Sequence, residues 1–119
     1  MNKISTEELF KTAYNYLQSK NYSKSIKLFK KIQLNYPNNL SVLRNLSHAY
    51  AFSGDFINAE NTIRNIIKLN EKEPYIFQFL ASILRNQDKI EEMIFLIDEG
   101  LKKGLLNPRW KYQKDLLFP

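Results

Sequence analysis

The sequence contains no cysteine and only one histidine, His48, among its 119 residues. Disulfides and thiolate metal sites are therefore excluded, and a metal centre would require an unusual cluster of carboxylates. The absence of cysteine also suits a reducing compartment. We expect neither a metal ion nor a cofactor, and we interpret His48 as a polar surface residue without a catalytic role.

Long apolar runs are missing as well. The longest strongly apolar, uncharged stretch is residues 74–84, well short of the roughly 20 residues that a membrane-spanning helix needs. The amino terminus carries Glu7 and Glu8 where a secretory signal needs an apolar segment. These features predict a soluble, cytoplasmic protein without membrane insertion or secretory export.

Motifs of catalysis are also lacking. With three glycines in all, the chain has no glycine-rich phosphate loop, and it has no nucleophile motif. Acidic pairs occur at residues 7–8, 91–92 and 98–99, but neighbouring side chains on a helix diverge by about 100° and do not converge on one bond. We therefore predict that the protein is not an enzyme and has no catalytic residue.

The chain is rich in apolar residues spaced three and four apart, which is the pattern of amphipathic helices. Helices are predicted between residues 5 and 19, 22 and 36, 40 and 53, 56 and 70, and 73 and 86, with a sixth from residue 90 that fades at Gly100 and Gly104. Gly54 and Asp55 are predicted to end one helix and cap the next, and Asp88 with Glu91 resembles another capping pair. A short seventh helix is predicted within residues 108–118.

The apolar pattern repeats every 34 residues, because large, small and aromatic residues recur in phase in three consecutive segments. The first helices of the segments align Leu9 with Leu43 and Phe77, then Ala13 with Ser47 and Ala81. The second helices align the columns Ser25, Ala59 and Met93; Phe29, Ile63 and Ile97; and Ile32, Ile66 and Gly100. This spacing and order resemble the tetratricopeptide repeat family over residues 6–107.

The resemblance implies an all-α fold, an α-solenoid of three antiparallel helical hairpins that form a superhelix. The whole chain, residues 1–119, would be one domain with repeats at about 6–39, 40–73 and 74–107. Residues 108–119 would cap the last repeat, because a repeat array otherwise leaves an apolar face in water.

In tetratricopeptide proteins the first helices line a concave groove that holds a peptide or a helix of a partner. Carried onto this chain, the family pattern predicts as the main binding residues Phe10, Lys11, Tyr14, Arg44, Asn45, His48, Phe52, Tyr75, Gln78, Phe79 and Arg85. The same pattern places Glu7, Leu17, Gln18, Ser41, Ala51, Ser82 and Asn86 in the groove. The aromatic excess favours an apolar ligand and the basic residues an acidic one. The predicted function is a non-catalytic protein-interaction module, a scaffold or chaperone-like adaptor.

One subfamily grips the carboxylate of chaperone tails with two lysines, two asparagines and an arginine. The corresponding positions here hold Phe10, Tyr14, Asn45, Tyr75 and Phe79, of which only Asn45 matches. We therefore expect no carboxylate clamp.

Two alternatives remain open. The chain could assemble with itself through residues 110–118 and its outer helices. A stripe of exposed charge at Lys20, Lys24, Lys27 and Lys31 could bind RNA. The aromatic residues beside this stripe are Tyr22 and Phe29, which the repeat pattern assigns to the core, so no bases would stack there and no nucleic-acid partner is expected. The net charge of +6 favours acidic partners without identifying one.

Overall fold

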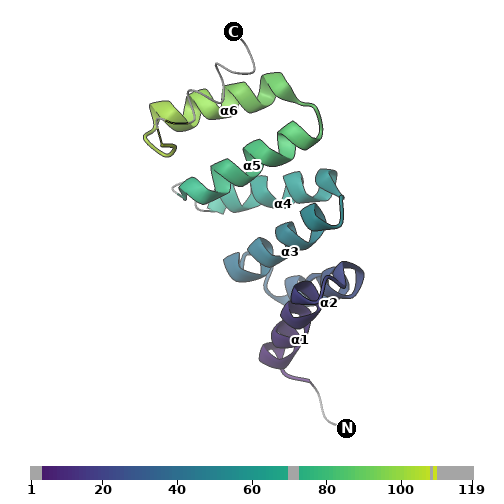
Figure 1. The fold of residues 1–119 in the computed structure, drawn as a ribbon. Helices are drawn as coiled ribbons and strands as arrows, with labels where there is room; N and C mark the ends of the chain where they lie inside the picture. The colour runs from purple at the N-terminus through teal and green to yellow at the C-terminus, as the bar shows by residue number, and fades with distance from the viewer. Residues whose placement is uncertain (1–3, 70–72, 108, 110–119) are drawn as a thin grey trace. The chain divides into compact units, whose positions relative to one another are not determined.

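The computed structural model describes residues 4–69, 73–107 and 109, which contain six helices and no strand (Figure 1). None of the helices in these ranges is long and apolar enough to cross a membrane. The chain forms two compact units, residues 1–66 and 67–119. The helices are α1 (Thr6–Gln18), α2 (Tyr22–Asn35), α3 (Leu40–Phe52), α4 (Phe56–Leu69), α5 (Pro74–Asn86) and α6 (Ile90–Lys102).

The first unit is held together where α2 packs against both α1 and α3. Small side chains permit the close approach: Ala13 and Ser25 are fully buried, and the Ser25 hydroxyl donates to the Ala13 carbonyl over 3.0 Å. Phe29 is also fully buried. A buried hydroxyl with a hydrogen-bond partner avoids the desolvation penalty of an orphaned polar group. The predicted small and aromatic columns of the first two repeats therefore form the apolar interior of this unit.

The turns between paired helices share one backbone geometry. Lys20, Gly54 and Asp88 have positive φ angles of 66°, 89° and 60°. In each turn the next residue donates its N–H to a carbonyl five positions earlier, over 2.8 Å from Asn21 to Tyr16 and 2.9 Å from Asp55 to Tyr50. This is the Schellman arrangement, which satisfies the last carbonyls of a helix. The short turns make each pair of helices antiparallel.

Side-chain caps follow the prediction in part. The Ser5 hydroxyl accepts from the Glu8 N–H over 3.2 Å, and Asp55 Oδ1 accepts from the Asn58 N–H over 3.2 Å. The predicted cap by Asp88 is wrong, because Asp88 occupies the left-handed turn position and Lys89 stands at the cap without a side-chain hydrogen bond. Asp88 therefore has the role of Gly54 in its repeat, not that of Asp55.

The second unit is built on the packing of α5 against α6. The predicted fading of the last helix at Gly100 is wrong, since α6 continues to Lys102, and the chain turns only at Gly104, whose φ is 69°. Gly100 is needed for packing: a Cβ at this position would lie only 2.6 Å from Cδ1 of the buried Leu106. Leu106 thus fills the space that isoleucine fills in the other repeats. The predicted cap helix, residues 108–118, lies outside the described residues apart from Arg109.

Candidate functional site

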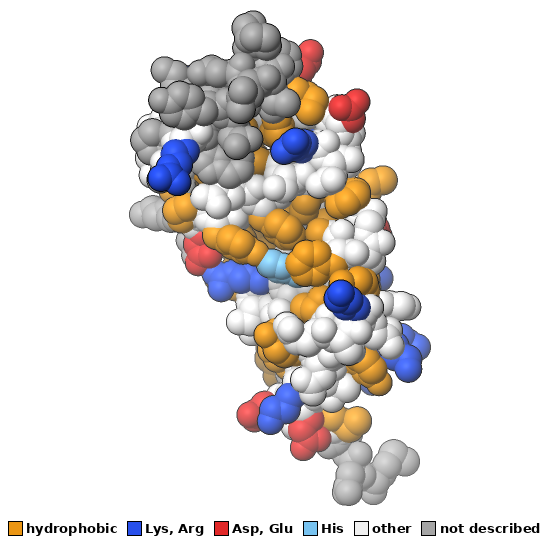
Figure 2. Space-filling model, viewed as in Figure 1, with side chains coloured by type: hydrophobic (Ala, Val, Ile, Leu, Met, Phe, Trp, Pro, Cys, Tyr) orange, Lys and Arg blue, Asp and Glu red, His pale blue; other side chains and the backbone are white. Residues whose placement is uncertain are grey.

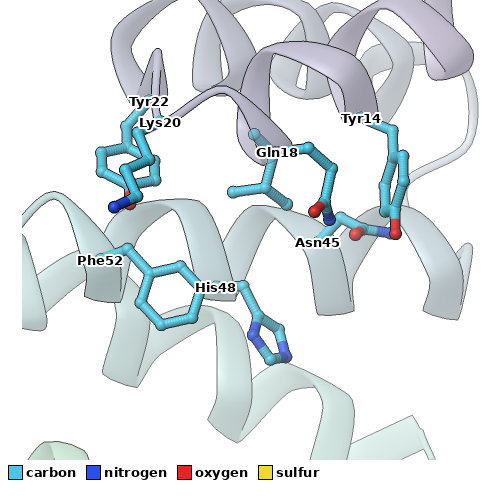
Figure 3. Close-up of a pocket in the computed structure, with 8 residues that line it drawn as sticks. Tyr14, Gln18, Lys20, Tyr22, Asn45, His48 and Phe52 are labelled. Carbon is cyan, nitrogen blue, oxygen red and sulfur yellow. The ribbon is translucent and has the colours of Figure 1, made fainter.

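The first unit contains a hollow of about 460 Å³ bounded by α1, the turn that follows it, the start of α2, and α3 (Figure 3). We call it the unit 1 hollow. Because its walls belong to three consecutive helices of one unit, local packing fixes their positions. The lining residues are Tyr14, Leu17, Gln18, Lys20, Tyr22, Asn45, His48 and Phe52.

Aromatic rings form much of the hollow's surface. Phe52 is 58% exposed and Tyr14 is 43% exposed, which is costly for rings of this size unless something covers them. Phe52 lies 6.1 Å from the Tyr22 ring and 5.6 Å from the His48 ring, measured between centroids. The Phe52 ring is therefore held against two neighbours, and its remaining surface is exposed on the wall of the hollow.

Polar side chains gather at the other end of the hollow. In Figure 3 the hydroxyl end of Tyr14 and the amides of Gln18 and Asn45 point toward the same region. The Asn45 amide nitrogen donates to the Ser41 carbonyl over 2.8 Å, so its carbonyl oxygen is turned away from that bond. This end offers donors and acceptors that can orient a peptide backbone, while the Phe52 end offers apolar surface.

Lys20 is the one charged residue among the eight that line the hollow. Residues 9–54 contain seven Lys or Arg and no Asp or Glu, and all eight lining residues fall inside this segment. Lys20 reaches the hollow from the turn after α1, next to Tyr22 (Figure 3). An acidic group on a ligand would therefore meet no lining carboxylate and would be attracted by Lys20.

The imidazole of His48 is half-buried on the surface among apolar side chains (Figure 2). Burial lowers the pKa of His48 from its usual value of about 6.5, because desolvation disfavours the charged form. His48 is accordingly neutral at pH 7 and adds an aromatic surface rather than a charge. In the described part of the chain, no group of three His, Cys, Asp or Glu residues could hold a metal ion.

The unit 1 hollow unites four of the eleven predicted binding residues, Tyr14, Asn45, His48 and Phe52, with Leu17 and Gln18 of the predicted groove. Two lining residues were missed. Tyr22 was assigned to the core by the repeat pattern, and Lys20 was assigned to the lysine stripe. The available signal was their position in the chain, because Lys20 lies in the turn and Tyr22 at the start of α2. Residues at such positions lie at the rim of a helical pair.

The other predicted residues of the first unit lie elsewhere. Phe10 is half-buried, with its ring edge-on to Phe29 at 5.5 Å between centroids, and it lines a separate hollow of about 250 Å³ with Glu7 and Tyr36. Lys11 is exposed and Arg44 is half-buried. Phe10 therefore has a packing partner of its own.

In the second unit, Tyr75 and Phe79 stack with centroids 6.1 Å apart and ring planes 9° from parallel. Gln78 is half-buried and Arg85 is exposed. These two rings, one helical turn apart on α5, form a separate aromatic surface.

A family model described as tetratricopeptide repeat matches residues 41–73, which covers α3 and α4. Residues 41–73 therefore form a tetratricopeptide repeat. The matched stretch is the repeat in which Gly54 occupies the turn and Ala59 the small buried position.

Solved structures resemble this chain over most of its length. The Sgt2 TPR domain from Aspergillus fumigatus has a TM-score of 0.73 at 18% identity, over 93% of this chain and 75% of that domain. The first TPR domain of Spaghetti (RPAP3), bound to the HSP90 peptide SRMEEVD, has a TM-score of 0.71 at 18% identity, over 92% and 89% of the two chains. The Yersinia enterocolitica type III secretion translocator chaperone SycD gives 0.74 at 20%, over 96% and 89%.

At these identities the likeness shows the fold, an all-α helical-repeat solenoid, and confirms the predicted fold class. No curated protein sequence matches this chain significantly.

Proposed function

We propose that this chain is a non-catalytic protein-interaction module that binds a peptide or a helix of a partner protein in the unit 1 hollow. The observation that carries the proposal is the exposure of Tyr14 and Phe52 on the walls of one hollow. Related folds support it: the first TPR domain of Spaghetti (RPAP3) is bound to an HSP90 peptide, and SycD is a translocator chaperone. A role as a cytoplasmic scaffold or chaperone-like adaptor agrees with this chemistry.

The two rings supply enough apolar surface for useful affinity. Fully burying an aromatic side chain contributes about 1.5–3 kcal/mol. Two such contacts, together with hydrogen bonds to Gln18 and Asn45, fit a dissociation constant in the micromolar range, about −8 kcal/mol, once the cost of association is included. A partner segment with one or two bulky apolar side chains matches the hollow best.

The proposal is tested by comparing what three forms of the chain capture from the cells that make it. The forms are the wild type, a Tyr14→Ala/Phe52→Ala variant, and a Leu34→Ala/Ile57→Ala variant. Leu34 and Ile57 are 83% and 69% exposed and lie outside the hollow, so the last variant removes a similar amount of exposed apolar surface.

Proteins captured by the wild type and by the Leu34→Ala/Ile57→Ala control, but lost from the Tyr14→Ala/Phe52→Ala variant, would support the proposal. Far-UV circular dichroism verifies that all three forms are equally helical. If a folded Tyr14→Ala/Phe52→Ala variant captured the same proteins as the wild type, the unit 1 hollow would not be the binding site.

A further inference from the structure

The second unit carries an exposed phenylalanine in an acidic setting. Phe95 on α6 is 68% exposed, the highest value for any aromatic ring in the described ranges. Glu91 and Glu92 precede it by four and three residues, and Glu99 follows by four, so all three carboxylates share its side of the helix. In α6 four residues are acidic and one, Lys102, is basic, with its Nζ 3.9 Å from Glu99 Oε1. We call Phe95 with these three glutamates the acidic α6 face.

This face is complementary to the unit 1 hollow. The hollow holds Phe52, the second most exposed aromatic ring of the described residues. It lies within the segment 9–54, which has seven basic residues and no acidic one. An exposed ring flanked by carboxylates thus exists in the same chain as an exposed ring flanked by lysine.

Two other strongly exposed apolar side chains lack this complementarity. Leu34 is on α2, whose charged residues are four lysines, so their charge has the same sign as that of Lys20 in the hollow. Ile57 is on α4, whose charged residues are Glu60, Arg64 and Lys68, so basic residues outnumber acidic ones on that helix. A single exposed apolar residue is ordinary on a protein surface, and it is the match of ring and charge that distinguishes Phe95.

We propose that the acidic α6 face of one copy docks on the unit 1 hollow of a second copy, with the Phe95 ring against Phe52 and the glutamates facing Lys20. The inference rests on the proposed function, since it names one occupant of the same hollow. The two surfaces differ, so the contact is heterologous, and each copy keeps one unused hollow or one unused face that can extend the assembly. Because one helix face covers little area, the association is weak and reversible.

The experiment is sedimentation velocity of the full chain over a range of concentrations, at about 0.05 M and about 0.5 M salt. The weight-average mass should rise above the 14.1 kDa of one chain as concentration increases, and the association constant should fall several-fold at the higher salt. Lys20→Glu impairs only the hollow and Phe95→Ala impairs only the acidic face. Each variant alone should remain monomeric, whereas Leu34→Ala should associate like the wild type.

Mixing the two monomeric variants provides the decisive test. A heterologous contact leaves one intact hollow on Phe95→Ala and one intact acidic face on Lys20→Glu, so the mixture should form a one-to-one dimer and nothing larger. A mixture that stays monomeric, a wild type that is monomeric at the highest concentration, or association that survives either substitution would overturn the proposal.

The self-association experiment and the partner-capture experiment can fail independently of each other. Phe95→Ala retains the hollow, so a monomeric wild type whose partner capture depends on Tyr14 and Phe52 would refute self-docking alone. A monomeric wild type, together with partner capture that is unchanged in the Tyr14→Ala/Phe52→Ala variant, would refute both proposals.

Discussion

Lys20 and Asp88 adopt the same left-handed backbone conformation, with φ angles of 66° and 60°, each 34 residues from Gly54, whose φ is 89°. The repeat therefore imposes this conformation on the turn whichever residue occupies it. For a residue with a Cβ the left-handed region costs roughly 1–2 kcal/mol, and aspartate tolerates it better than lysine does. Lys20 is thus the least favourable of the three occupants for stability.

Lys20→Gly should stabilise the chain by about 1 kcal/mol, because glycine relieves the left-handed strain and loses part of that gain to its larger unfolded-state entropy. The melting temperature should rise by a few degrees for a chain of this size, roughly 4 °C. Lys31→Gly, a change of the same type in the interior of α2, should instead destabilise by about 1 kcal/mol. A Lys20→Gly variant that melts below the wild type would contradict the strain argument.

The same substitution separates binding from stability. Lys20 lines the unit 1 hollow, so Lys20→Gly should weaken the capture of an acidic partner while the chain becomes more stable. Isothermal titration with a partner identified by capture measures the effect, which should be about 0.5–1 kcal/mol because the lysine is exposed. Unchanged or tighter binding would exclude Lys20 from the site.

Gly100→Ala should destabilise the chain even though alanine is the better helix former. A Cβ there would lie 2.6 Å and 2.7 Å from Leu106 Cδ1 and Cγ, and overpacking costs about 1–3 kcal/mol, against about 1 kcal/mol gained in helix propensity. In a Leu106→Ala background the same change should become stabilising by up to about 1 kcal/mol. Chemical denaturation of the four forms measures this coupling, and additive effects would show that Leu106 does not pack on Gly100.

Gly54 and Gly100 show which parts of the fold the sequence could and could not predict. The helices and the Gly54 turn were predictable because the periodicity and the turn chemistry are local signals. Gly100 was misread as a helix end, because its partner Leu106 packs on it only after the chain has turned at Gly104. Asp88 was misread as a cap, because aspartate suits both a cap and a left-handed turn.

The candidate site was predictable to a smaller extent. Tyr14 and Phe52 are exposed and His48 is half-buried, which agrees with their positions outside the buried columns of α1 and α3. The repeat pattern does not reveal that Phe10 packs edge-on against Phe29, or that Tyr22 reaches the rim beside Phe52. Both facts depend on how neighbouring helices pack, which a pattern along one helix does not encode.

His48 should make stability depend on pH. Burial lowers its pKa in the folded chain below about 6.5, so the unfolded chain binds the proton more readily. The free energy of unfolding should therefore be unaffected by His48 above about pH 7, fall as pH drops below about 6.5, and level off below the folded pKa. A His48→Gln variant should lack this decline, so the stability difference between wild type and variant should change between about pH 7.5 and pH 5.5. Denaturation curves that shift in parallel over this range would contradict a lowered pKa.

If the proposed function is right, residues of the unit 1 hollow contact a partner protein in the cell. Phe52 is exposed and stands on the wall of the hollow, whereas Leu34 is exposed on α2 outside it. A photo-reactive phenylalanine analogue placed at either position should leave the fold unchanged, because neither side chain is buried.

The most direct measurement is photo-cross-linking in the native cell with the analogue at position 52 and, separately, at position 34. A discrete cross-linked partner is expected from position 52, is expected to disappear when Tyr14→Ala is added, and is not expected from position 34. No product from position 52, or the same product from both positions, would contradict the proposed function.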